Sequence, residues 1–458
     1  MAFDSPQNTP HDQTPPSWKD DWTLVVDLGV VFDVQGPHGK LGADEALHDL
    51  EGRLAAIPKQ PKGQGGETVR LVVGALTAHD DKYDFNVYKL QDGQLQLLSS
   101  APTLGLESDL RKLTSFASPR FRDEKMGLVI NAHGTPTPGY LVGGDSGTST
   151  VMQPDAFRSI VKEWVNKDPL GFDQRKTGDR KLEFLNLESC FGAKLGNLNF
   201  AAGLAKNVVA SELTVHEGEF FSGSGGPDVT LNGQNVAKIY EDLVNQPKLS
   251  GYELAELAIA DANAGANDRS VDGEKFSATP TLAHYDLGAP REQLAKSLDG
   301  LGAVLTASLA NPAGRKQIDG IIDGIPDLWS DEDTPKPENA KYAGRDLQTF
   351  LDQLEIAVNN KSLADEGGAI TRAIGTVRGA EKDFVKTLHA VKSGDEWYRT
   401  QFIDPEKLGG VSVSLPAESV RADASITSDD YSQTVGSDFS EAEAPNWRKF
   451  LTTLRDQH

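Results

Sequence analysis

Two stretches of the chain, GLVINAHG (127–134) and LEFLNLESCFG (182–192), decide which fold the sequence predicts. Each begins with an apolar run typical of a buried strand, and each ends in a polar turn rich in small residues. The first run leads into His133, and the second leads into Glu188 and Cys190. Because the carboxyl ends of parallel strands meet at one edge of a sheet, we expect these side chains to lie near one another.

Strand and helix patterns alternate through the first half of the chain. Strands are predicted at 22–28, 69–76, 83–90, 127–132, 182–187 and 207–211, and helices at 43–54, 107–116 and 154–165. This alternation predicts an α/β sandwich with a mostly parallel central sheet. From about residue 250 amphipathic helical patterns prevail, at 252–262, 292–309, 345–358 and 381–391.

The chain divides into three parts that differ in composition and in predicted secondary structure. Residues 1–20 are polar and proline-rich, and we expect them to be disordered. Residues 21–250 are predicted to form the catalytic α/β domain. Residues 251–458 are predicted to form a mainly helical region that packs on this domain and includes a short strand at 410–416.

The net charge and the distribution of apolar residues argue against two classes of partner. Asp and Glu number 68 against 45 Lys and Arg, which gives a formal net charge of -23. Such a charge repels phosphate backbones and anionic lipids, so we expect no nucleic acid as a partner. No apolar run approaches the roughly 18 residues of a membrane span, so we expect no membrane either. The acidic surface either keeps the protein in solution or attracts basic peptides, and charge alone does not decide between the two.

The chain has one cysteine, Cys190, which excludes an internal disulfide and fits a reducing compartment. The N-terminal stretch MAFDSPQNTPHDQTPPSWKDD lacks the basic start and the apolar core of a secretory signal. We therefore expect a cytoplasmic protein.

A catalytic role for Cys190 requires a neighbouring base. A free thiol with a pKa near 8.5 is only slightly ionised at neutral pH, and an adjacent imidazole increases the thiolate fraction. His133 is the natural candidate, and the backbone N–H groups of Gly134 and Cys190 are candidates for an oxyanion hole. The alternative is that Cys190 is an inert, buried residue, as single cysteines often are. Its position at a strand end favours catalysis.

At this point the chain resembles the clostripain-like peptidases of the caspase-like clan, whose motifs are an apolar strand ending in His-Gly and another ending in acid-x-Cys. Further stretches resemble that family in the family's order. They are WTLVVDL (22–28), VVASE (208–212), TLAHYDL (281–287), GVSVSLP (410–416) and FSEAEAPNWRKFL (439–451).

The resemblance implies a caspase-like three-layer core, a dyad of Cys190 and His133, and endopeptidase activity on proteins and peptides. In that family the acid two positions before the nucleophile helps to bind an Arg or Lys, and here it is Glu188 in place of the more usual Asp. Carboxylates favour cationic side chains, arginine above all. Legumain-like relatives carry Glu at this position and prefer asparagine, so both preferences stay open, as does a mere capping role. Glu212 and Glu217 are further candidates for the substrate pocket.

Peptidases of this clan are often precursors that are cut in the loop before the catalytic strand. That loop holds four basic residues, Arg175, Lys176, Arg180 and Lys181. The alternatives are self-cleavage in this loop, activation by an upstream protease in a signalling or defence cascade, and an ordinary solvated loop.

The sequence also bears on cofactors and on alternative functions. No stretch reproduces an EF-hand loop, so the sequence shows no required cofactor and no metal ligands, although calcium supports some clostripain-like enzymes. A catalytically silent caspase-like scaffold protein is the alternative function, and a thiol hydrolase that is not a peptidase is a third.

Overall fold

The structure is a computed structural model in which the placement of most of the chain is defined. The described segments are 22–28, 43–57, 69–79, 82–119, 124–131, 133–134, 141–143, 150–167, 180–189, 192–213, 233–264, 268–271, 274–277, 281–326, 328, 344–390, 407–416, 418–421 and 438–455. The segment 1–20, predicted to be disordered, lies outside them.

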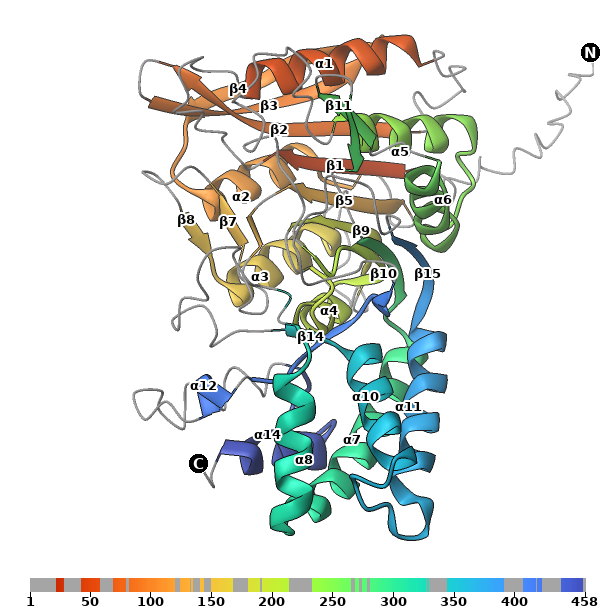
Figure 1. The fold of residues 1–458 in the computed structure, drawn as a ribbon. Helices are drawn as coiled ribbons and strands as arrows, with labels where there is room; N and C mark the ends of the chain where they lie inside the picture. The colour runs from red at the N-terminus through yellow and green to blue at the C-terminus, as the bar shows by residue number, and fades with distance from the viewer. Residues whose placement is uncertain are drawn as a thin grey trace, which may run out of the picture.

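The described strands build one large sheet with the order β15-β13-β10-β9-β5-β1-β2-β3-β4 (Figure 1). Its centre is parallel and consists of β2 (Val69–His79), β1 (Trp22–Leu28), β5 (Lys125–Asn131), β9 (Leu182–Glu188) and β10 (Ala205–Ala210). The flanking strands are antiparallel to their neighbours: β3 (Lys82–Gln91) and β4 (Gln94–Pro102) at one edge, β13 (Thr281–Asp286) and β15 (Val385–Ala390) at the other. The prediction of a mostly parallel central sheet is confirmed.

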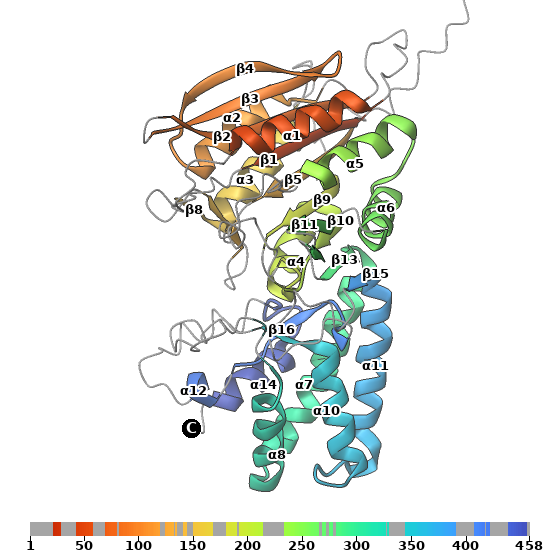
Figure 2. The ribbon, with the colours of Figure 1, turned by 45° about the horizontal axis from the view of Figure 1, so that its top comes forward.

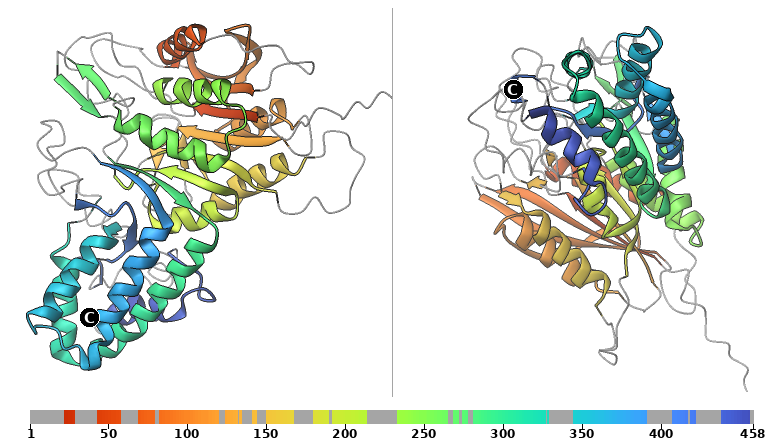
Figure 3. Two further views of the ribbon diagram at one scale, coloured as in Figure 1. Left: turned by 90° about the vertical axis from the view of Figure 1, so that its right-hand side faces the viewer. Right: turned by 90° about the horizontal axis from the view of Figure 1, so that it is seen from below.

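Helices cover both faces of the sheet, which gives the three predicted layers (Figure 3). One face packs on α1 (Ala43–Ala56), α5 (Gly233–Asn245) and α6 (Gly251–Asn263), and the other on α2 (Leu106–Phe116), α3 (Pro154–Val165) and α4 (Leu195–Ala202). From Phe184 to Leu187 the side chains of β9 alternate between the two cores: Phe184 enters the first, and Leu185 and Leu187 enter the second. This alternation is the period of two expected of a strand.

The C-terminal helices lie beyond the β15 edge of the sheet (Figures 1 and 2). They are α7 (Ala289–Leu309), α8 (Pro312–Asp323), α10 (Leu347–Asn359), α11 (Ala369–Phe384), the short α12 (Glu418–Arg421) and α14 (Pro445–Arg455), with the 3-10 turn η3 (Glu366–Gly368) before α11. Their strands β14 (Gly344–Asp346) and β16 (Ser412–Ser414) pair antiparallel. The remaining strands are the β11 (Asp268–Val271) and β12 (Glu274–Ser277) hairpin and β6 to β8, described with the site. None of the described helices is long and apolar enough to cross a membrane.

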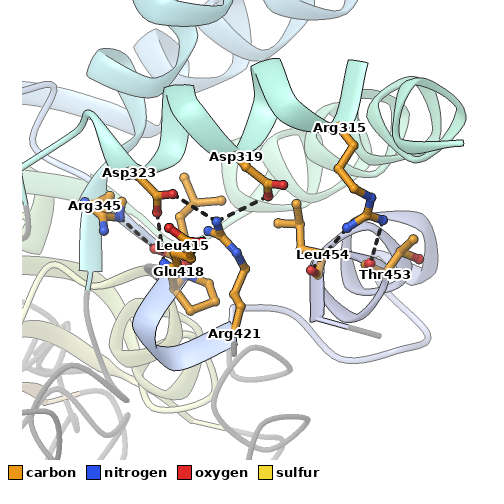
Figure 4. Close-up of polar contacts among 10 residues, drawn as sticks. Arg315, Asp319, Asp323, Arg345, Leu415, Glu418, Arg421, Thr453 and Leu454 are labelled. Carbon is orange, nitrogen blue, oxygen red and sulfur yellow. Dashed lines mark hydrogen bonds and ion pairs between the residues drawn. The ribbon is translucent and has the colours of Figure 1, made fainter. Parts of the chain in front are cut away.

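Buried arginines hold the helical region together (Figure 4). The guanidinium of Arg421 is fully buried and lies 3.2 Å from Asp319 and 3.1 Å from Asp323, which are one turn apart on α8. Arg345 of β14 donates from Nε to the carbonyl oxygen of Leu415 at 2.8 Å. Each guanidinium therefore joins segments that are distant in sequence.

The structure corrects three predictions. Residues 381–391 were expected to be one helix, but α11 ends at Phe384 and β15 begins at Val385, because β15 pairs with β13 at the edge of the sheet. No strand was predicted after the turn that ends β3, but the structure has one there, β4. The sheet also continues past residue 250, since β13 and β15 belong to it and α6 packs on it. In all three cases long-range strand pairing decided the outcome.

The close approach of α7 to α14 provides a test of this packing. A Cβ atom added at Gly302 would lie 2.5 Å from the backbone of Trp447, whereas one added at Gly300 would meet nothing within 4 Å. We expect Gly302→Ala to destabilise the protein by about 1–3 kcal/mol through overpacking. Gly300→Ala, on the same helix, should be neutral or stabilising by about 0.5–1 kcal/mol. Thermal unfolding checks both, and equal melting temperatures for the two variants would contradict the packing.

Candidate active site

The register of β5 and β9 sets side by side the two strand ends that precede the predicted dyad residues in the sequence. The two strands are parallel neighbours, and Asn131 is paired with Glu188 at their carboxyl ends. His133 follows Asn131 by two residues, and Cys190 follows Glu188 by two residues. Neighbouring strands lie about 4.8 Å apart, so the chain leaves the sheet at adjacent points before each of these residues.

The two dyad residues differ in how far the structure describes them. His133 and Gly134 form β6, which pairs with β7 (Leu141–Gly143), and β7 pairs with β8 (Thr150–Met152). Cys190 lies outside the described residues. The backbone of the histidine side is therefore described, and on the cysteine side the description covers the residues before and after Cys190.

A tight turn brackets Cys190. The Gly192 N–H donates to the carbonyl oxygen of Ser189 at 3.3 Å, and the Ala193 N–H donates to the carbonyl oxygen of Ser211 on the β10 side at 2.8 Å. A Cβ atom added at Gly192 would lie 3.2 Å from the Cβ of Ala210, so a glycine fits best here. The end of the turn thus packs directly on the sheet.

Glu188 is a buried carboxylate beside this turn. Its side chain has 6% of its surface exposed, and its Oε1 accepts a hydrogen bond of 3.0 Å from Nδ2 of the fully buried Asn186. Asn186 was not predicted as a site residue. The sequence pattern that could have indicated Asn186 is the polar residue at every second position of FLNLE, because residues two apart on a strand lie on the same face.

Glu212, predicted as a pocket residue, lies in a different environment. It is 1% exposed, and its backbone N–H donates to Thr281 Oγ1 at 3.2 Å. Burial first, and then the nearby carboxyls of Asp346 and Glu381, raise the pKa of Glu212 well above its usual range. A neutral acid has no charge with which to select a cationic side chain. Glu217, the other pocket candidate, lies outside the described residues.

The basic loop before β9 is described in part. Arg180 donates from Nη2 to the carbonyl oxygen of Glu124 at 2.9 Å, and Lys181 donates from Nζ to that of Ala202 at 2.6 Å. Both side chains are half-buried and brace the start of β9. Arg175 and Lys176 lie outside the described residues.

No metal site is found in the part of the chain that the structure describes. No group of three or more His, Cys, Asp or Glu side chains there is arranged to hold a metal ion. The buried acids Glu212, Asp346 and Glu381 do not form such a group.

Comparison with solved structures places the fold. The chain matches a secreted C11 cysteine protease of Bacteroides thetaiotaomicron in complex with an irreversible peptide inhibitor, with a TM-score of 0.54 over 93% of this chain and 98% of that one, at 13% identity. It matches the same organism's secreted C11 protease "iotapain" with a TM-score of 0.53 over 90% and 99%, at 9% identity. An inactive zymogen C11 protease of Parabacteroides distasonis gives 0.52 over 87% and 93%, at 11% identity.

The chain has the fold of the C11, clostripain-like cysteine proteases. No protein-family model matches the sequence, and no curated protein matches it. The agreement nevertheless spans both the α/β core and the C-terminal helices, because nearly the whole length of each chain is covered. The predicted caspase-like architecture is confirmed.

The buried acids predict a pH-dependent stability. Burial first, and then Asp346, raise the pKa of Glu381 from 4.5 to about 8, with Arg378 opposing. A raised carboxyl pKa costs stability as the pH rises from the unfolded to the folded value. Between pH 4.5 and 8 we expect Glu381 to lower the stability by on the order of 1 kcal/mol per pH unit.

Glu381→Gln should remove this cost. The free energy of unfolding of the variant, measured with urea, should therefore rise relative to that of the wild type from pH 5 to pH 8. The exposed Glu366→Gln on the preceding turn serves as the control and should follow the wild type at every pH. A wild type and Glu381→Gln that keep a constant difference across this range would contradict the interpretation.

Proposed function

We propose that this protein is a cysteine endopeptidase in which Cys190 is the nucleophile and His133 is the general base. The observation that carries the proposal is the pairing of Asn131 with Glu188, because His133 and Cys190 each follow one of these paired strand ends by two residues in the sequence. The shared fold with C11 cysteine proteases supports it independently. The turn closed from Gly192 to Ser189 supplies the constrained geometry that a nucleophile needs.

The mechanism follows from these groups. The imidazole of His133 takes the thiol proton of Cys190, and the thiolate attacks the carbonyl carbon of the scissile peptide bond. The backbone N–H groups of Gly134 and Cys190 stabilise the oxyanion that forms. His133 then gives its proton to the leaving amine, and water, activated by the same imidazole, hydrolyses the thioester and frees the enzyme.

The substrates of this enzyme would be proteins or peptides. A structural neighbour is in complex with a peptide inhibitor, which supports this class. We propose that Glu188 selects an arginine or lysine before the scissile bond, because a buried carboxylate held by Asn186 favours a cation that donates hydrogen bonds to it. The alternative is an asparagine preference.

Activation by cleavage is part of the proposal. One structural neighbour is an inactive zymogen. Because Arg180 and Lys181 brace β9 through their side chains, Arg175 and Lys176 are the better candidates for a cut by the enzyme itself or by an upstream protease. Calcium dependence, a cascade role and a cytoplasmic location remain predictions; two neighbours with this fold are described as secreted.

The dyad is tested by replacing its members. Cys190→Ala and His133→Ala should each lower kcat/KM on a fluorogenic arginyl peptide by at least about 10³-fold, as loss of a nucleophile or its base does in related mechanisms.

Wild-type protein purified alongside Cys190→Ala should show two fragments on a denaturing gel where the variant shows one band. Undiminished hydrolysis by Cys190→Ala would exclude the dyad, and a wild-type thiol inert to iodoacetamide would favour a scaffold function.

The specificity is tested by two neutral replacements. Glu188→Gln removes the proposed cation-binding charge and should lower kcat/KM for arginyl peptides by about 10- to 100-fold, with little change for uncharged ones. Glu212→Gln mimics the neutral form that burial favours by raising the pKa of Glu212, so its kcat/KM should stay within about threefold of wild type. A preference lost in Glu212→Gln and retained in Glu188→Gln would reverse the assignment.

A further inference from the structure

A histidine is fully buried where α6 packs on the sheet. His284 lies on β13, and none of its side chain is exposed. Both nitrogens of its ring face oxygen atoms: Nδ1 lies 2.6 Å from Oε1 of Glu256 on α6, and Nε2 lies 3.1 Å from Oδ1 of Asn207 on β10. The ring of Tyr252 packs edge-on against the imidazole, with 4.8 Å between the centroids. The ring is thus held on two sides by hydrogen-bond acceptors.

These two acceptors require two N–H groups on one ring. Asn207 donates from Nδ2 to the carbonyl oxygen of Glu183 at 2.9 Å, which turns its Oδ1 toward the ring, so Nε2 of His284 carries a hydrogen. An ionised Glu256 has no hydrogen to donate to Nδ1, and a neutral imidazole has only one N–H. The arrangement therefore holds one proton more than a neutral imidazole and a carboxylate, whichever of the two groups carries it.

The same carboxylate joins α6 to two strands. Thr387 of β15, which is paired with His284 in the sheet, donates from its hydroxyl to Oε1 of Glu256 at 3.0 Å. Glu256 thus bonds to β13 and β15 at once. Of these strands, β15 is the last in the sheet and pairs there with β13, and α11 runs directly into it (Figure 1). The hold of α6 on this edge depends on the state of Glu256.

We propose that His284 and Glu256 form a proton-dependent clasp that holds α6 on β13 and β15. With the extra proton in place, the clasp has the bonds described above. Without it, a lone pair of Nδ1 and a carboxylate oxygen would face each other at 2.6 Å. His284 is fully buried and stays in place, whereas the Glu256 side chain is 30% exposed and can turn into water. Its bonds to both strands are then lost, and the edge of the sheet loosens.

The charged and titratable groups around the ring set the pH at which the clasp opens. On α6 they are Glu256 and Tyr252, on β13 Asp286, and on β15 Lys386. Burial lowers the pKa of His284 from its usual 6.5, while Glu256 and Asp286 act to raise it and Lys386 to lower it. The pKa of Tyr252 is raised, so the phenol stays neutral in this range. We therefore expect the proton to leave below pH 6.5, with the clasp closed near pH 5 and open at pH 7.5.

The sign of the linkage follows from the charge of Glu256. Because this charge favours the proton on His284, the folded wild type binds the proton more readily than a folded variant without the charge. A falling pH therefore stabilises the wild type relative to such a variant. In Glu256→Gln the amide can donate to a neutral Nδ1 and accept from Thr387, so the clasp of this variant needs no extra proton.

Hydrogen exchange followed by mass spectrometry tests the clasp in the full chain. Wild type, Glu256→Gln and the control Glu253→Gln are compared at pH 5 and pH 7.5, with exchange rates corrected for their intrinsic dependence on pH. Glu253 lies on the same helix, and its Oε2 accepts hydrogen bonds from the N–H and the hydroxyl of Ser250 at the helix start, both at 2.8 Å. Its replacement weakens α6 without changing a partner of His284.

We expect protection of residues 251–263 and 385–390 in the wild type to fall at least about tenfold from pH 5 to pH 7.5, since one pKa unit corresponds to a tenfold change in an equilibrium. In Glu256→Gln the protection at the two pH values should agree within about threefold. Glu253→Gln should be less protected at the start of α6 but keep the fold-change of the wild type. Strand β1 (Trp22–Leu28) should keep its protection throughout, which separates local opening from global unfolding.

Three results would overturn the clasp: equal protection of the wild type at both pH values, a fall shared equally by β1, or a fall in Glu256→Gln as steep as in the wild type. If Glu256→Gln does not fold, His284→Gln, which lacks the titrating ring, takes its place under the same criterion. The clasp and the proposed dyad are independent, so none of these results bears on the peptidase proposal.

Discussion

The parallel pairing of β5 with β9 is the constraint on which the candidate site depends. Strand side chains alternate between faces, so a slip of one residue would exchange the two cores. Leu185 and Leu187 enter one core and Phe184 enters the other, which makes any slip costly. The same register that buries these residues sets Asn131 opposite Glu188. Packing far from the chemistry thereby determines where the histidine and the cysteine leave the sheet.

Ionisable groups are concentrated where the sheet meets the C-terminal helices. Glu212 from the end of β10 faces Asp346 and Glu381, and both Lys194 before α4 and Asp438 beside β16 are buried. Apolar residues of similar size would often be at least as stable in such places. Charged groups instead tolerate few alternative arrangements, because each displaced partner leaves a buried charge uncompensated. The junction therefore gains a defined geometry at the expense of some stability.

Local patterns in the sequence were sufficient where an element depends on its own residues. The observed limits of β1 and α3 are those predicted, since a β-branched run in one and amphipathic spacing after a proline in the other decide the structure. Residues 385–390 were misassigned because their strand exists only through pairing with β13. The dyad positions stay a prediction from the strand ends. The burial of Lys194 and Asp438 could not be predicted, because each has the sequence pattern of an ordinary surface residue until the fold encloses it.

The order of the chain gives the C-terminal segment a role that its distance from the motifs conceals. The candidate dyad precedes residue 191, yet β16 and Asp438 contact α4 and the residue before it from more than 200 residues farther along the chain. Folding of the C-terminal region is thus coupled to the surroundings of α4, because these contacts form only when the last segment has docked.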